Sequence, residues 1–130
     1  MVEIKDLDLS SFEKAIKSLR SAISKTELSE LERDGVIQRF EYTFELAWKT
    51  IRRVLIAMGR SDVSSSPKPI FRDAFEEGHI EDVELWFKFL EARNLTTHIY
   101  NSVQAEKVVK VAKEFLPNVE KLLKKIKDLK

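Results

Sequence analysis

The chain has 130 residues, of which 43% are hydrophobic and 35% charged, and it carries a formal net charge of +1 and no cysteine. This composition predicts a single folded helical domain, residues 1–130, and excludes a disordered or fibrous chain, thiol catalysis, a disulfide framework and cysteine-ligated zinc. The N-terminus has no apolar signal region and no run approaches the roughly 18 apolar residues of a membrane span, so we expect a soluble cytoplasmic protein.

The first predicted helix follows Ser10 and Ser11, which are both suitable N-cap residues. Its apolar residues recur at steps of four and three, as in an amphipathic helix: Phe12, Ile16, Leu19 and Ile23. We expect this face to be buried.

The next segment, TELSELERDG, offers N-caps at Thr26 and Ser29, but Gly35 weakens any helix through it. It predicts only a short turn of helix or a helical lead-in. A central helix then begins at Val36 and ends at Gly59. Its apolar stripe consists of Ile37, Phe40, Phe44, Ala47, Trp48, Ile51, Leu55 and Met58. We expect its aromatic residues to lie in the core rather than to form a stacking platform.

The serine- and proline-rich stretch SDVSSSPKP predicts an exposed connection within the domain. Ser66 and Pro67 can cap and begin a helix that ends at Gly78. Its apolar residues are Ile70, Phe71, Ala74 and Phe75. A further helix is predicted from about Glu81, with these residues facing inward: Val83, Trp86, Phe87 and Leu90.

A last long helix is predicted from Ser102, which can act as its cap, and its apolar period continues past Pro117. Because proline removes a backbone hydrogen bond, we expect a kink or a brief interruption near residues 114–117. No strand pattern or repeat is present. Long amphipathic helices with short connections predict an all-α fold, an antiparallel helical bundle with one or two short extra helices.

Charge is unevenly placed along the chain. Residues 76–91 hold six acids against Lys88 alone, whereas residues 107–130 hold eight lysines against three acids. This pattern is typical of two solvated helix faces, but it also suits a contact surface for RNA or a partner.

Familiar catalytic motifs are missing from the sequence, which has no glycine-rich phosphate loop, no H-E-x-x-H and no nucleophile elbow. His79 follows Gly78 at a helix end, so we expect it at the surface or in the C-cap. Glu41 and Glu45 lie one turn apart, but no Glu-x-x-His partner exists for a di-iron site. We expect these two acids to pair within their own helix, with Arg39, Lys49 and neighbours.

The stretch ARNLTTHIYN contains three chemically useful side chains in the order R-x4-H-x-Y. Arg93 can bind a phosphate with a fixed fork of donors, His98 can move a proton near neutral pH, and the Tyr100 hydroxyl can donate and accept hydrogen bonds. A structural role is the alternative, with Arg93 capping a helix, His98 bonded in a turn and Tyr100 packed.

Geometry decides whether Arg93 and His98 can act together, because an ideal helix would place them roughly 140° apart. The residues between them include poor helix formers, so a local distortion could bring the two side chains together. A two-fold axis that faces two copies of the stretch could also do so.

Several stretches resemble, in order and spacing, the family of nucleotidyltransferase substrate-binding proteins, a branch of the HEPN superfamily. They are RDGVIQRFEYTFELAWKTIRRVL, SPKPIFRDAFEEGHI, Trp86 and RNLTTHIY, and together they span roughly residues 12–123. The resemblance implies an up-and-down four-helix bundle that forms a homodimer. It also implies a partner, a minimal nucleotidyltransferase that acts as antitoxin to this chain.

In that branch the HEPN member is similar to a metal-independent RNase without a cofactor. The resemblance then implies that Arg93 and His98 from two subunits form one cleft, in which His98 takes the proton of an RNA 2′-hydroxyl. It implies that Asn94 and Thr97 orient these groups, and that the partner adds AMP to Tyr100. Two other hypotheses stay open: a non-catalytic subunit that presents a substrate to the nucleotidyltransferase, and a plain helical dimerisation module.

Overall fold

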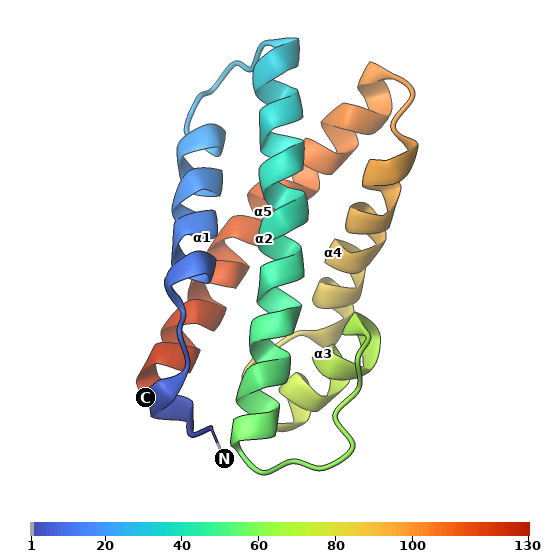
Figure 1. Cartoon of the computed structure of the whole chain (residues 1–130). Coiled ribbons are helices and arrows are strands. Elements are labelled where there is room, and N and C mark those ends of the chain that lie inside the picture. The colour runs from blue at the N-terminus through green and yellow to red at the C-terminus, as the bar shows by residue number, and fades with distance from the viewer. Residues whose placement is uncertain (1) are drawn as a thin grey trace.

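A computed structural model describes residues 2–130 as an all-α chain, with no strand in that range. Its helices are α1 (Ser10–Ile23), α2 (Glu30–Ala57), α3 (Pro67–Glu76), α4 (Val83–Leu95) and α5 (Ser102–Leu129), with 3-10 turns η1 (Ile4–Asp6) and η2 (Thr96–His98). Helices α1, α2, α4 and α5 alternate in direction, and the short α3 covers one end of the bundle (Figure 1). The predicted up-and-down bundle is confirmed. Within the described range, no helix is both long and apolar enough to cross a membrane.

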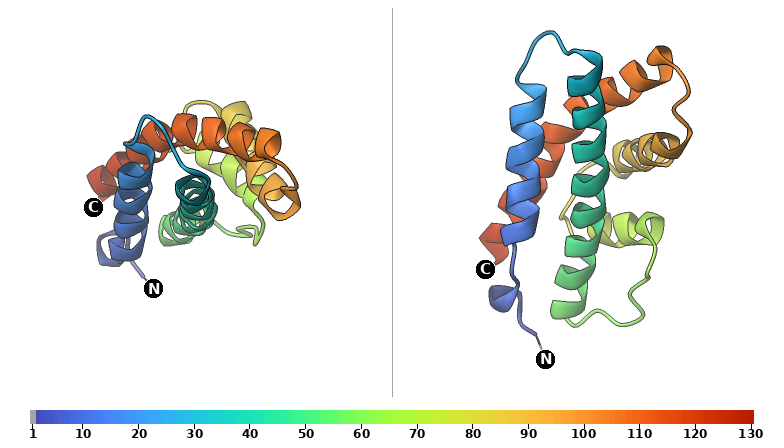
Figure 2. Two further views of the ribbon diagram at one scale, coloured as in Figure 1. Left: turned by 90° about the horizontal axis from the view of Figure 1, so that it is seen from above. Right: turned by 45° about the horizontal axis from the view of Figure 1, so that its top comes forward.

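The core forms where the apolar stripes of the helices meet around α2, which contacts each of the other helices. Seen from above, α5 arches across one side of the bundle (Figure 2). Its Phe115 is fully buried and lies with its ring centroid 5.2–6.3 Å from those of Phe40, Phe44, Trp86 and Phe89. The aromatic residues of the α2 apolar stripe, Phe40, Phe44 and Trp48, therefore belong to the core, as predicted. Truncating Phe115 to alanine would cost about 3–5 kcal/mol of stability.

Helix α2 begins at Glu30, six residues before the predicted start. Ser29 forms a capping box, in which its hydroxyl accepts the Glu32 N–H and the Glu32 carboxylate accepts the Ser29 N–H. Lys25 also binds Glu32, and its hydrogen bond, followed by those from Ser29, lowers the pKa of Glu32 to about 2.

Gly35 lies inside the helix, where an added Cβ would lie 3.2 Å from Arg39 Nη1. Of the two predictions for this segment, the helical lead-in is confirmed and the separate short turn is wrong, because the cap outweighs the glycine.

Arg60 holds α3 against the end of α2 through ion pairs of 2.8–2.9 Å with Asp73, Glu76 and Glu77. Gly78 adopts a φ of 77°, which turns the chain so that the His79 N–H donates to the Ala74 carbonyl. His79 therefore belongs to the C-cap, as predicted.

The expected surface position of the His79 side chain is wrong. The residue is only 5% exposed, and its Nε2 lies 3.2 Å from Met58 Sδ. The backbone turn that caps α3 directs the imidazole inward, where burial lowers its pKa below the ordinary value of 6.5.

Two predicted caps are displaced by a residue or more. The Asp8 side chain accepts the Ser10 N–H ahead of α1, and Asn101 rather than Ser102 caps α5 by accepting the Gln104 N–H at 2.9 Å. Of the two outcomes expected near residues 114–117, the brief interruption is wrong, because helix α5 continues through Pro117. The helix bends along its length (Figure 2), which does not contradict the expected kink.

Candidate functional site

The candidate site lies where α4 ends and α5 begins, and its residues explain the break. The Thr96 hydroxyl donates to the Arg93 carbonyl at 2.7 Å, and the Thr97 hydroxyl donates to the Asn94 carbonyl at 3.0 Å. These bonds occupy carbonyls at the C-terminus of α4, after which the chain forms η2 and becomes extended at Ile99. The junction is thus a distorted helix end.

Arg93 faces α2 and is held by two carboxylates. Its Nε lies 3.2 Å from Glu45 Oε1, and its Nη1 lies 3.5 Å from Glu41 Oε2. The Nε contact is an ion pair without the alignment of a hydrogen bond, so this buried donor has no hydrogen-bond acceptor among the described residues. Thr96 Oγ1 lies 3.0 Å from Glu41 Oε2 and completes the cluster.

The predicted pairing of Glu41 within α2 is wrong, because Arg39 turns to the Ser18 hydroxyl and the Gly35 carbonyl instead. Glu45 does lie 4.0 Å from Lys49, and it also accepts a hydrogen bond from the Trp48 indole at 3.1 Å. The contacts of these two acids with Arg93 are not predicted from the sequence. Their position one turn apart, at the margin of the buried stripe of α2, is the signal that could have indicated it.

His98 and Tyr100 form the exposed part of the junction. His98 Nδ1 lies 3.2 Å from the Tyr100 hydroxyl, and their ring centroids are 6.3 Å apart. The Tyr100 side chain is open to solvent, because the residue is 80% exposed. Its backbone N–H donates to Gln104 Oε1 at 2.8 Å, which ties the exposed segment to the first turn of α5.

Within one chain the structure brings His98 to Tyr100 but does not pair Arg93 with His98. Arg93 contacts α2, whereas His98 contacts Tyr100, and residues 2–130 contain no hydrogen bond between the two. Asn94 and Thr97 are exposed, and the Thr97 hydroxyl donates to the Asn94 carbonyl. Neither residue forms a hydrogen bond with the side chain of Arg93 or His98 within the described residues.

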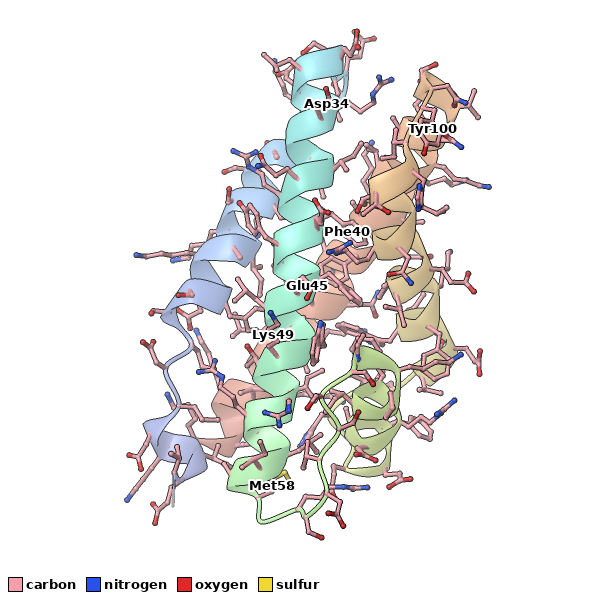
Figure 3. The ribbon with its side chains drawn as sticks, turned by 45° about the vertical axis from the view of Figure 1, so that its right-hand side comes forward. Asp34, Phe40, Glu45, Lys49, Met58 and Tyr100 are labelled. Carbon is pink, nitrogen blue, oxygen red and sulfur yellow. The ribbon has the colours of Figure 1, made fainter. Side chains whose placement is uncertain are left out.

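A pocket of about 430 Å³ opens beside Tyr100, between the start of α2 and the start of α5. It is lined by Glu30, Arg33, Asp34, Ile99, Tyr100, Asn101, Ser102 and Ala105. Asp34 and Tyr100 lie at the same end of the bundle (Figure 3). Residues 2–130 contain no group of three or more histidine and acidic side chains arranged to hold a metal ion.

Both the sequence and the fold of the chain are similar to those of known proteins. The sequence pattern of the family described as "Nucleotidyltransferase substrate binding protein like" matches residues 7–128. A Haemophilus influenzae protein named "Probable ribonuclease HepT" is 32% identical over 96 residues. That match spans 72% of this chain and 66% of the relative, just under two thirds of its length.

Two solved structures have similar folds. A Thermus thermophilus protein superposes with a TM-score of 0.83 at 32% identity, over 88% of this chain and 98% of its own. HI0074 from Haemophilus influenzae superposes with a TM-score of 0.81 at 26% identity, over 92% and 99%. Its structure is described as the fold of a substrate binding domain of a nucleotidyltransferase.

Proposed function

The chain belongs to the family of nucleotidyltransferase substrate-binding proteins, and from this premise we propose that it is a metal-independent, toxin-type endoribonuclease with a minimal nucleotidyltransferase as its partner. One observation carries the proposal. Arg93, His98 and Tyr100 lie within eight residues at one helix junction, with His98 Nδ1 only 3.2 Å from the Tyr100 hydroxyl. The name of the Haemophilus influenzae relative, a probable ribonuclease, supports the same chemistry.

His98 acts as the general base. When Nδ1 carries the hydrogen and donates it to the Tyr100 oxygen, Nε2 keeps a free lone pair. Nε2 takes the proton from an RNA 2′-hydroxyl, and that oxygen forms a bond to the adjacent phosphorus. The bond from phosphorus to the 5′-oxygen breaks, and the leaving oxygen takes up a proton. The products are a 2′,3′-cyclic phosphate and a 5′-hydroxyl.

Arg93 stabilises the charge that develops on the phosphoryl oxygens, a task that suits a planar guanidinium. We propose a homodimer, in which Arg93 of one subunit and His98 of the other share one cleft. The separate partners of Arg93 and His98 within one chain support this arrangement.

AMP addition to Tyr100 silences the site. The hydroxyl is exposed and reachable by a partner enzyme, and it lies against His98. A phosphodiester on this oxygen places a negative charge beside His98, blocks the approach of RNA phosphate and removes the acceptor that holds the imidazole. The pocket of about 430 Å³ beside Tyr100 leaves space for the added nucleotide.

The direct test is cleavage of RNA by the purified protein and by His98→Ala and Arg93→Ala variants. The wild type is expected to release fragments with cyclic phosphate ends, and both variants are expected to lose at least about a hundredfold in rate. Cleavage that survives both substitutions would sink the proposed site. Addition of EDTA is expected to leave the rate unchanged.

Silencing is tested by incubating the protein with its partner nucleotidyltransferase and ATP and measuring the intact mass. The wild type is expected to gain AMP and lose activity. Tyr100→Phe is expected to gain no mass, and Tyr42→Phe, which changes another exposed tyrosine, serves as the control. If Tyr100→Phe still gains AMP, Tyr100 is not the acceptor.

A non-catalytic substrate-binding subunit is the second candidate, favoured by one observation. The Arg93 charge is opposed by two carboxylates, as in a structural ion pair. In this case the purified protein cleaves no RNA, and its loss instead lowers the activity of the nucleotidyltransferase.

A further inference from the structure

A local excess of positive charge lies outside the candidate site, on α2 and α3. Residues 46–72, which cover the second half of α2, the connection and the first half of α3, contain six basic residues and one acid, Asp62. Arg60 is occupied by three carboxylates. Lys49 has only a 4.0 Å contact with Glu45, and no ion pair forms at Arg52, Arg53, Lys68 or Arg72 within residues 2–130.

Four of these residues, Lys49 and Arg52 on α2 and Lys68 and Arg72 on α3, are together called the cationic track. Lys49 and Arg52 line a shallow pocket of about 430 Å³, together with Trp48, Arg53 and Ser65. The Arg52 Nε donates to the Ser64 carbonyl at 2.9 Å, which fixes the connection to α3 against α2. The track therefore passes from α2 to α3 through an ordered connection.

On α3 the track is supported by an aromatic ring of α4. Lys68 Nζ lies 4.9 Å and the Arg72 guanidinium 5.6 Å from the ring centroid of Phe87. These cation–π contacts hold two exposed cations without neutralising them. Glu84 and Glu91, the acids of α4 nearest to Phe87 in sequence, form no ion pair with either cation in the described chain.

The track adjoins the candidate site through Glu45. This carboxylate contacts Arg93 at 3.2 Å and Lys49 at 4.0 Å, so both cations lie around one side chain. Figure 3 shows Glu45 and Lys49 one after the other along α2. A chain of phosphates that passes Arg93 can therefore continue along α2 toward α3.

We propose that the cationic track binds the phosphodiester backbone of single-stranded RNA next to the phosphate held by Arg93, an inference that rests on the proposed function. Exposed cations such as Lys68 and Arg72, which have no carboxylate partner in the described chain, bind phosphates by releasing counterions, and this binding is independent of sequence. An acidic protein surface is the less suitable ligand. Trp48 is 9% exposed and Phe87 is half-buried, so the track offers little of the apolar area that a protein interface core requires.

The test compares two matched pairs of lysine substitutions in the full chain carrying His98→Ala. Lys49→Ala with Lys68→Ala removes two cations of the track, and Lys110→Ala with Lys113→Ala removes two exposed lysines of α5 that form no ion pair within residues 2–130. Arg52 is left unchanged, since its bond to Ser64 shapes the connection. Binding of a fluorescein-labelled single-stranded RNA is measured by anisotropy over a range of salt concentrations, and circular dichroism checks that each variant is folded.

The track pair is expected to raise the Kd for RNA roughly tenfold near physiological salt. It is also expected to make the negative slope of log association constant against log salt concentration shallower by about 1.4, the change that corresponds to the loss of two phosphate contacts on a single strand. The α5 pair is expected to change both much less. Equal effects of the two pairs, or no salt-dependent RNA binding by the parent chain, would overturn the inference.

Two further outcomes separate this inference from the function on which it rests. A chain with His98 intact that binds RNA through the track without cleaving it overturns the proposed ribonuclease and supports the track. A track pair that keeps full RNA affinity but no longer binds the partner nucleotidyltransferase assigns the surface to a protein and overturns the inference.

Discussion

Arg93 carries one positive charge against the two carboxylates of Glu41 and Glu45, so this cluster has a net charge of −1. The carboxylates fix the guanidinium in place, which favours catalysis because less ordering remains for the transition state. They also repel the phosphate that Arg93 must bind. Positioning and affinity therefore oppose each other at this residue.

Glu45→Gln separates the two effects. Loss of one negative charge is expected to lower KM for RNA, and loss of the anchor at Arg93 Nε is expected to lower kcat roughly tenfold, equivalent to about 1.4 kcal/mol in the barrier. Steady-state cleavage kinetics measure both constants. Glu84→Gln, which changes an exposed acid of α4 without an ion pair in the described chain, is the matched control. An unchanged kcat would show that Glu45 does not position Arg93.

His79 provides a pH-dependent contribution to stability. Burial lowers the pKa of its imidazole, with Glu77 opposing and Lys125 adding to the shift. As the pH falls below 6.5, the unfolded chain takes up a proton that the folded chain resists, so the free energy of unfolding decreases. Urea unfolding is measured at pH 7.5 and 5.5, about one unit above and below the ordinary pKa of histidine. Between these values, the free energy of unfolding is expected to decrease less for His79→Gln than for the wild type. Equal decreases would contradict this account.

At the scale of single residues, the sequence predicts which side chains can take part in chemistry better than it predicts which residues those side chains contact. The R-x4-H-x-Y pattern identifies Arg93, His98 and Tyr100 as a group because their side-chain types are informative by themselves. It cannot reveal that Arg93 faces Glu41 and Glu45, since that contact depends on how α4 packs against α2. His79 was misplaced for the same reason, because Gly78 predicts the turn but not the direction of the next side chain.

Among the elements, α2 depends on its first turn. The capping box at Ser29 satisfies two backbone N–H groups and begins the helix five residues before Gly35. Ser29→Ala is expected to lower the free energy of unfolding by about 1 kcal/mol, because the Glu32 N–H loses its acceptor. Guanidinium unfolding followed by circular dichroism measures the change.

The same substitution at a position without a capping role provides the control for α2. Ser11→Ala lies in the first turn of α1, where no side-chain cap forms, and is expected to change stability far less. If Ser29→Ala is as stable as Ser11→Ala, the capping box does not hold the start of α2.

Helix type and order are predictable from the sequence, and so are the ends that proline or glycine marks, such as Pro67 and Gly59, whereas the start of α2 is not. The periods of apolar residues in α1 and α5 are long enough to specify amphipathic helices. Gly35 and Pro117 do not interrupt their helices, because their local propensity costs about 1–3 kcal/mol and a buried apolar face recovers it. Val36 and Ile37 are buried directly after Gly35, and Phe115 and Val119 are buried on either side of Pro117.

For the whole molecule, the arrangement of helices places the candidate site at one end of the bundle, away from both termini (Figure 1). Antiparallel α4 and α5 meet there, so the R-x4-H-x-Y stretch forms the connection between two helices rather than a face of one. Such an end is free to meet the same end of a second copy. Because Arg93 and His98 have different partners in one chain, the proposed dimer must complete the site.

Mixing two inactive variants tests whether the site is shared. Arg93→Ala and His98→Ala homodimers each lack one essential group, but random exchange of subunits yields about half heterodimers, each with one Arg93 and one His98 on different chains. If the site uses groups from opposite subunits, mixing is expected to restore a measurable fraction of RNA cleavage. If both groups act within one chain, no heterodimer contains an intact pair and activity stays at the level of the separate variants. Size-exclusion chromatography with light scattering establishes that the chains exchange, so that a negative result has a single meaning.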